Sequence, residues 1–208
     1  MAINAENKSA PRELVPAGNH VARCYKMIHL GHIQEDYQGE SKTLNKVSIG
    51  WELPNERKVF RAENGEQPYV ISKEYTLSLH EKAKLRKILE SWRGKPFTEQ
   101  EAKSFDITKL LGAACMINII HKVSTKGNPY EEISSITPVP KGMTCPKQEN
   151  PTTVLSYDDF NWELYESLPD FIKNKMKEST EFKEMLQPAE KIDTSKKQPI
   201  EDIGDLPF

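Results

Sequence analysis

Five segments of the chain alternate between apolar and polar residues, and this period of two restricts the possible fold more than any other feature of the sequence. The segments are residues 20–30, 47–53, 69–79, 113–123 and 130–139. Alternation of this kind predicts β-strands with one buried face. Pro54 is expected to end the second strand, because proline interrupts the hydrogen bonding of a sheet. Lys26 falls on the apolar side of the first strand, and a β-bulge would restore the pattern.

One helix is marked clearly between the third and fourth strands. Its apolar stripe has helical spacing and consists of Leu85, Ile88, Leu89 and Trp92. Ser78 and Glu81 match a capping box before the stripe, and Gly94 follows it. Residues 31–43 and 54–68 are polar and contain glycine, so they are expected to be connections. The predicted order is strand, strand, strand, helix, strand, strand.

The chain changes character after Pro146. Two amphipathic helices are predicted over residues 159–168 and 170–186, and their apolar residues, Phe171 among them, are available to pack on the body. Residues 188–208 contain too few apolar side chains to bury themselves and are expected to be a disordered tail. We therefore divide the chain into a body of residues 1–146, a helical extension of residues 147–187 and a tail of residues 188–208.

The charges of the 208-residue chain are unevenly distributed. Residues 1–150 carry 22 Lys and Arg against 18 Asp and Glu, whereas residues 151–208 carry 7 against 13. A mildly basic body thus precedes an acidic end, which is compatible with a polyanionic partner. No apolar run approaches the roughly 18 residues of a membrane helix, and the first residues lack a targeting pattern. We expect a cytoplasmic protein without membrane contact.

Motifs of common enzymes are missing from the sequence. Cys24, Cys115 and Cys145 are widely spaced, which fits a reducing compartment and does not fit a zinc site. The chain contains neither a phosphate-binding G-x-x-x-x-G-K-[ST] loop nor a dinucleotide-binding G-x-G-x-x-G turn. We therefore expect no catalytic activity, no metal and no cofactor.

The last residues of the chain have the composition of a peptide that other proteins bind. The residues expected to make these contacts are Asp202, Asp205, Leu206, Pro207 and Phe208. Phe208 offers an apolar ring, the carboxylates require a basic partner, and Pro207 lowers the entropic cost of ordering the peptide. An end of the chain without function is the alternative.

This ending, D-x-G-D-L-P-F, resembles the acidic tip of bacterial and phage single-stranded-DNA-binding proteins, although it has fewer acidic residues than their usual tip. The body is similar to a group of phage-encoded single-stranded-DNA-binding proteins in the segments VPAGNHVARCY, VSIGWELP, ISKEYTLSLHEKAKLRKILESWRGKPF and NPYEEISSITPVPKG. The resemblance implies an OB-fold, a five-stranded barrel with a helix between strands three and four. It also implies sequence-independent binding of single-stranded DNA during phage replication or recombination, recruitment of partner enzymes by the tip, and a location in the host cytoplasm.

Given an OB-fold, strand parity and loop position predict the DNA-binding residues. Phosphates need cations and bases need flat rings, and the candidates that supply them are Arg23, Tyr25, His29, Lys42, Lys46, Lys122, Lys126 and Tyr130. Arg23 could instead pair with Glu52, and Tyr25 could cover one end of the barrel. Trp51 and Trp92 lie on apolar stripes and are expected in the core.

Two other functions remain open. The barrel could bind a partner protein, in which case the chain is an interaction adaptor without a DNA role, or it could belong to an OB-containing nuclease. Alanine at Arg23 and Tyr25 is expected to abolish DNA binding if the DNA hypothesis is correct. The sequence is also compatible with a homo-oligomer.

Overall fold

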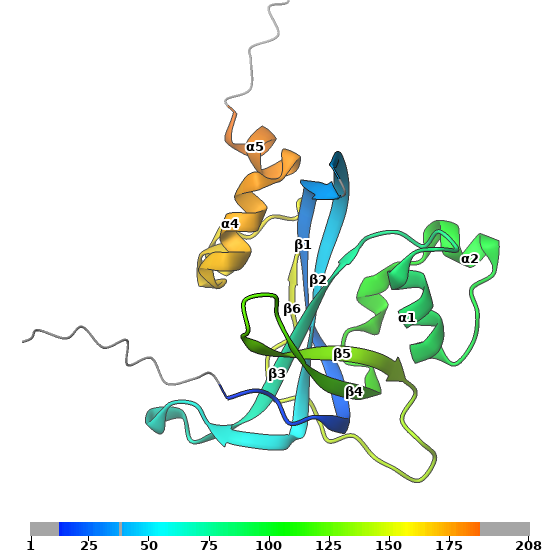
Figure 1. Ribbon diagram of the computed structural model, residues 1–208, viewed down its shortest axis with the longest axis vertical. Helices are drawn as coiled ribbons and strands as arrows, with labels where there is room; N and C mark the ends of the chain where they lie inside the picture. The colour runs from blue at the N-terminus through cyan, green and yellow to red at the C-terminus, as the bar shows by residue number, and fades with distance from the viewer. Residues whose placement is uncertain (1–12, 38, 188–208) are drawn as a thin grey trace, which may run out of the picture.

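The computed structural model describes residues 13–37 and 39–187, and one β-sheet forms its centre (Figure 1). The strands are β1 (Gly18–Tyr37), β2 (Glu40–Val59), β3 (Glu66–Thr76), β4 (Ala114–Val123), β5 (Pro129–Thr137) and β6 (Thr153–Leu155). Their order is β3-β2-β1-β4-β5 with antiparallel neighbours, and β6 pairs in parallel with β1. The predicted mainly β architecture is confirmed.

The sheet is not closed into a barrel. Among the described strands, β3 and β5 stand at the two ends of the order and share no backbone ladder. The side chain of Lys73 on β3 spans this opening, since its Nζ donates to the carbonyl oxygen of Ile133 at 2.8 Å and lies 3.3 Å from a carboxylate oxygen of Glu132. A side chain thus links the two edges where a closed barrel would have paired strands.

The first hairpin is longer than predicted. Residues 31–43, expected to be a loop, continue β1 and β2 to the Tyr37–Glu40 pair. Beyond the Lys46–Thr76 pair β2 has no β3 neighbour, and among the described side chains of residues 31–43 only Ile33 packs in a core, which is too few apolar residues to produce a recognisable alternation. Pro54 does not end β2 either, because a register shift between Leu53 and Arg57 accommodates it.

The expected bulge in β1 is confirmed. The register of β1 against β2 shifts between Cys24 and Lys26, and it shifts again between His29 and Gly31. As a result Met27 joins the core inside the sheet, while Ile28 and Leu30 face a second core on the opposite side.

Helices α1 (Lys84–Arg93) and α2 (Glu99–Ser104) lie between β3 and β4, followed by a short 3-10 helix, η2 (Ile107–Leu110). Another short 3-10 helix, η1 (Ala62–Asn64), lies between β2 and β3. Gly94 ends α1 in the left-handed conformation with φ of 67°, as expected. The capping box predicted at Ser78 is wrong, because α1 begins after Ala83 without a side-chain cap. The box belongs to α2, where Thr98 and Glu101 cap one another.

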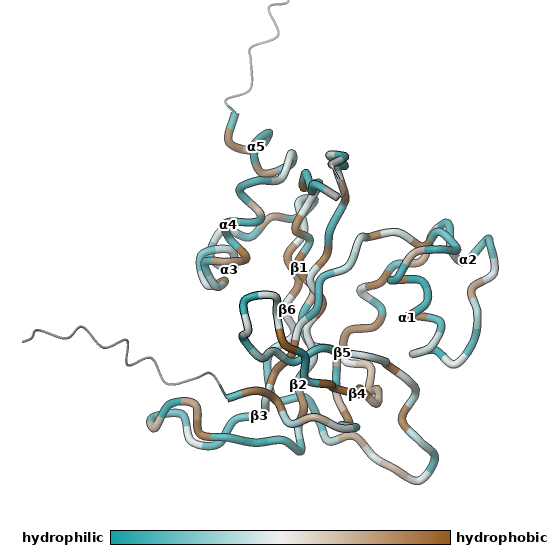
Figure 2. Tube along the Cα trace, viewed as in Figure 1, coloured by the Kyte–Doolittle hydropathy of each residue, from teal (hydrophilic) through white to brown (hydrophobic). Residues whose placement is uncertain are grey.

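The C-terminal helices are α3 (Trp162–Ser167), α4 (Asp170–Glu178) and α5 (Thr180–Leu186). Helices α4 and α5 pack directly on the outer side of β1, and α3 joins the same core through Tyr165. Figure 2 shows hydrophobic segments along β1 and in the neighbouring α3. Together they form the second core, with Ile28, Leu30, Ile33, Leu155, Tyr165, Leu168, Ile172, Met176 and Phe182. The single helix predicted over residues 170–186 is interrupted at the buried Ser179, whose Oγ accepts from the Phe182 N–H and donates to the Met176 carbonyl.

No helix in the described ranges is long and apolar enough to cross a membrane. The predicted tail and its tip residues lie outside the described residues.

Candidate nucleic-acid interface

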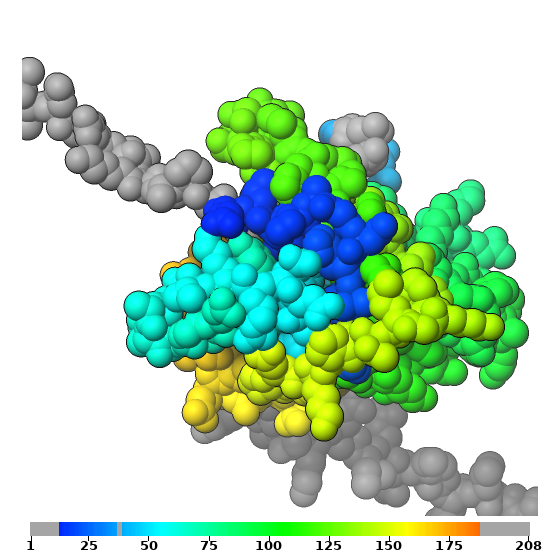
Figure 3. All heavy atoms as spheres, turned by 90° about the horizontal axis from the view of Figure 1, so that it is seen from below, coloured from blue at the N-terminus to red at the C-terminus, as the bar shows by residue number. Residues whose placement is uncertain are grey.

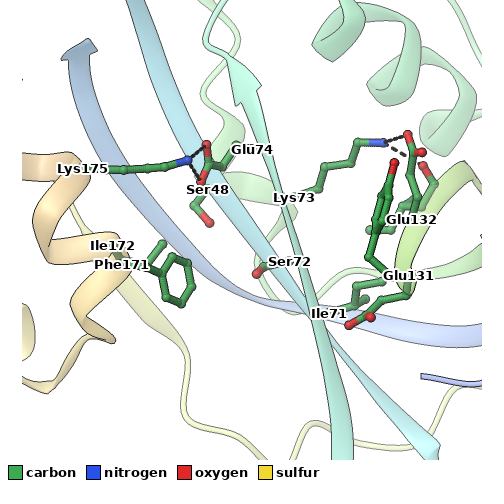
Figure 4. A pocket seen from close by; sticks show the side chains of 12 residues that line it. Ser48, Ile71, Ser72, Lys73, Glu74, Glu131, Glu132, Phe171, Ile172 and Lys175 are labelled. Carbon is green, nitrogen blue, oxygen red and sulfur yellow. Dashed lines mark hydrogen bonds and ion pairs between the residues drawn. The ribbon is translucent and has the colours of Figure 1, made fainter. Parts of the chain in front are cut away.

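A groove of about 670 Å³ crosses the outer face of β2 and β3 (Figure 4). Ser48 of β2 and Ser72 of β3 form its floor. One wall is α4, and the other is the start of β5. The remaining lining residues are Ile71, Lys73, Glu74, Tyr130, Glu131, Glu132, Ile133, Phe171, Ile172 and Lys175.

The two walls each present an exposed aromatic ring. Tyr130 on β5 is 41% exposed, and Phe171 on α4 is 59% exposed. Figure 4 shows the Phe171 side chain extending from α4 toward the groove. Exposed rings that face a groove are the stacking platforms used for single-stranded bases.

Phe171 reaches the groove because of its position on α4. Ile172 and Met176 are four residues apart and buried in the second core. Phe171 and Lys175 have the same spacing, so they share the neighbouring face of the helix and line the groove. The sequence pattern predicts that Phe171 packs on the body. Phe171 does not lie on the Ile172–Met176 stripe, however, and this difference in angle around the helix indicates that its side chain faces another direction.

The groove itself is not electropositive. Lys175 Nζ lies 2.6 Å from both carboxylate oxygens of Glu74, and Lys73 Nζ lies 3.3 Å from one oxygen of Glu132 (Figure 4). Lys122 Nζ lies 2.6 Å from the other oxygen of Glu132. Hydrogen bonding to Lys122, with Lys73 also close, holds the pKa of Glu132 below its ordinary value. Because three glutamates and two lysines line the groove, phosphates would have to compete with these carboxylates for the ammonium groups.

A second hollow, of about 590 Å³, continues the groove and has the opposite charge balance. It shares Lys73 and Glu74 with the groove and runs between the β1–β2 hairpin and the start of α1. Four lysines and two glutamates line it, with Lys46, Lys82 and Lys84 joining Lys73. Lys46 is paired with Glu35 at 2.8 Å. The predicted Lys46 therefore lies on the same continuous surface as Tyr130.

Arg23, by contrast, is committed to contacts within the chain. Its guanidinium donates to the carbonyl oxygens of Gly112 at 2.6 Å, Cys145 at 3.0 Å and Pro146 at 2.9 Å. The alternative partner, Glu52, is fully buried and accepts instead from the backbone N–H groups of Glu149 and Asn150. Both residues hold the segment after β5 against the sheet, and Figure 3 shows this segment in yellow-green beside β2 in cyan.

Tyr25 is not exposed as predicted. Only 8% of it is accessible, and burial raises the pKa of its hydroxyl to about 12. The prediction is wrong because the ring is covered on the outer side of the sheet: its Cε1 lies 3.6 Å from a Cβ atom added at Gly50, and the ammonium group of Lys26 lies 5.5 Å from its centroid. His29 is half-buried, with Nε2 2.7 Å from Asn45 Oδ1 and its ring edge-on to Tyr157. The three candidates on the first strand therefore do not form an exposed cluster.

The loop candidates are more accessible. Lys42 is exposed and paired with Glu40 at 2.8 Å, and Lys126 is exposed in the β4–β5 turn. The structure thus brings Tyr130 to the groove, Lys122 to the groove residue Glu132, Lys46 to the adjoining hollow and Lys126 to the nearby turn. Trp51 and Trp92 are buried with ring centroids 6.0 Å apart, which confirms their predicted place in the core.

No family model matches the sequence, and no match is found among curated proteins or among solved structures. Within residues 13–37 and 39–187, no group of three or more His, Cys, Asp or Glu side chains is placed to hold a metal ion.

Proposed function

We propose that this protein binds single-stranded DNA without sequence preference in the groove between α4 and β5. The observation that carries the proposal is the pair of exposed rings, Tyr130 and Phe171, on opposite walls of that groove. Stacking of a base on such a ring contributes about 1–3 kcal/mol and does not depend on which base is present. The lysines of the adjoining hollow supply charge for the backbone of a strand that leaves the groove.

The sheet supports an OB-fold as the finer description. Five antiparallel strands with helices between the third and fourth agree with it, and OB barrels are commonly only partly closed. In that fold the face of strands two and three binds oligonucleotides, together with the loops that join strands one to two and four to five. The groove lies on the corresponding face. A phage-encoded role in replication or recombination, and recruitment of enzymes by the tip, stay predictions from the sequence.

A second function is favoured by one observation. Carboxylates outnumber ammonium groups in the groove, three to two, so a basic peptide segment would also be attracted there. This corresponds to the interaction adaptor without a DNA role.

A titration with fluorescent oligo-dT and duplex competitors, at two salt concentrations, tests the proposal. We expect binding to single strands to be tighter than to duplex and to weaken with salt. Loss of one stacking platform in Phe171→Ala or Tyr130→Ala should lower the affinity by about 5- to 150-fold, the equivalent of 1–3 kcal/mol.

Phe60→Ala is the matched control, because Phe60 is 51% exposed but lies outside the groove. This variant should bind like the wild type. Equal affinity of the wild-type protein for oligo-dT and duplex would reject the DNA proposal and favour the adaptor.

A further inference from the structure

Lys26 differs from the two lysines that line the groove, Lys73 and Lys175, in having no acidic partner. Lys46, Lys73, Lys122 and Lys175 are each paired with a glutamate. Lys26 is half-buried, and neither a carboxylate nor a hydrogen-bond acceptor contacts its ammonium group among the residues that the structure describes. Burial alone lowers its pKa. An unpaired, partly desolvated charge is unfavourable for the folded chain, so its acceptor is expected to come from outside.

The position of Lys26 directs it toward the groove floor. Lys26 pairs with Gly50 of β2, and Gly50 pairs on its other side with Ser72 of the floor. These three residues form one row across the outer face of the sheet, opposite to Met27 in the first core. Adjacent strands are roughly 4.8 Å apart, so the lysine stem can cover the distance to the middle strand.

Gly50 provides the space for this stem. A Cβ atom added at Gly50 would lie 3.1 Å from Cε and 3.2 Å from Cβ of Lys26, which shows that the stem lies over the glycine. The ammonium group lies 5.5 Å from the centroid of the Tyr25 ring. A cation on an aromatic face is held in position without being neutralised. Buried Tyr25 therefore acts as a support for Lys26.

We infer that Lys26 binds a phosphate of the single strand at the floor of the groove, above Gly50. The inference rests on the proposed function and adds a cation that, unlike Lys73 and Lys175, is not paired with a glutamate. Bases stacked between Tyr130 and Phe171 would leave the backbone near the floor, and there the ammonium group of Lys26 does not need to be released from a glutamate.

Lys26→Gln in the full chain tests the inference through affinity for oligo-dT and its salt dependence. We expect about tenfold weaker binding at low salt. The slope of log affinity against log salt should fall by about 0.7, the value for one lost phosphate contact on a single strand. Lys26→Arg keeps the charge and should keep the slope. Removal of a half-buried unpaired charge should not lower the urea midpoint, so loss of binding would not reflect unfolding.

Lys109→Gln is the matched control, because Lys109 is exposed on η2 and lines neither the groove nor the adjoining hollow. It should bind within about twofold of the wild type with an unchanged slope. If Lys26→Gln behaves like Lys109→Gln while the wild type binds oligo-dT, the inference is wrong and the proposed function stands. If the wild type does not prefer single strands, the proposed function fails first.

Discussion

At the scale of single residues, Arg23 illustrates how a side chain with the right chemistry for DNA can be used by the fold instead. Its guanidinium satisfies carbonyl oxygens of Gly112, Cys145 and Pro146. We predict that Arg23→Met lowers the free energy of unfolding by about 1–3 kcal/mol, because these carbonyls lose charged donors. Urea unfolding measures this loss.

The same variant should bind oligo-dT within about twofold of the wild type under conditions where it is folded. Unchanged stability together with lost DNA binding would restore the interpretation made from the sequence.

Strand parity predicts the faces of β-residues only where the register is continuous. It correctly predicts Trp51 in the core, and Trp92 follows from the helical stripe. It predicts the side of Tyr25 but not its burial, because the bulge also places Lys26 on the outer side of the sheet, where its ammonium group lies over the Tyr25 ring. Phe171 was missed for another reason: an apolar residue at the end of a stripe is assigned to packing unless its angle around the helix is considered.

At the scale of elements, the docking of α5 on β1 depends on a close contact at the second bulge. Gly31 has φ of 88°, and a Cβ atom there would lie 2.6 Å from Glu181 Oε2. That carboxylate accepts from the backbone N–H of His32 at 2.8 Å and contacts His32 Nδ1 at 2.5 Å. Burial alone would raise the pKa of Glu181, but these hydrogen bonds outweigh it and hold the pKa below its ordinary 4.5.

We predict a pH-dependent contribution of Glu181 to stability. Since its pKa is lower in the folded state, the contribution is complete above about pH 4.5 and is lost as the pH falls through the folded-state pKa. The free energy of unfolding of the wild type and of Glu181→Gln, measured from neutral pH to about pH 3, should therefore differ less at the acidic end. A difference that is constant across this range would contradict the assigned contact.

The elements themselves were largely predictable, and their ends were not. All five major strands and α1 occur where periodicity predicts them. The outer part of the β1–β2 hairpin has too few apolar residues to show alternation because β3 does not extend beside it, and the break at Ser179 depends on a hydroxyl that is satisfied only in the folded chain. Both depend on contacts distant in sequence, which local patterns do not encode.

At the scale of the whole molecule, β1 joins two hydrophobic cores that lie on its opposite faces. We therefore predict that both cores unfold in one transition. Met176 is fully buried in the second core, and Met176→Ala should cost about 2–5 kcal/mol. In a Trp162→Phe background, which removes the tryptophan of the helical extension, the fluorescence of Trp51 and Trp92 in the first core should report the same lowered urea midpoint as far-UV circular dichroism.

Separate midpoints for the two signals would show that the helical extension unfolds independently of the body. In that case the division of the chain at residue 147 would describe two folding units.

The two bulges of β1 have a consequence for how the chain can change over evolution. Met27 and Ile28 are neighbours that enter different cores, so a single deletion between the bulges would exchange the faces of the residues after it and expose both cores at once. Substitutions of similar size are tolerable there, whereas changes in length are not. Insertions and deletions should accumulate in divergent homologues at the tip of the first hairpin. The segment of β1 between the two bulges should keep a constant number of residues.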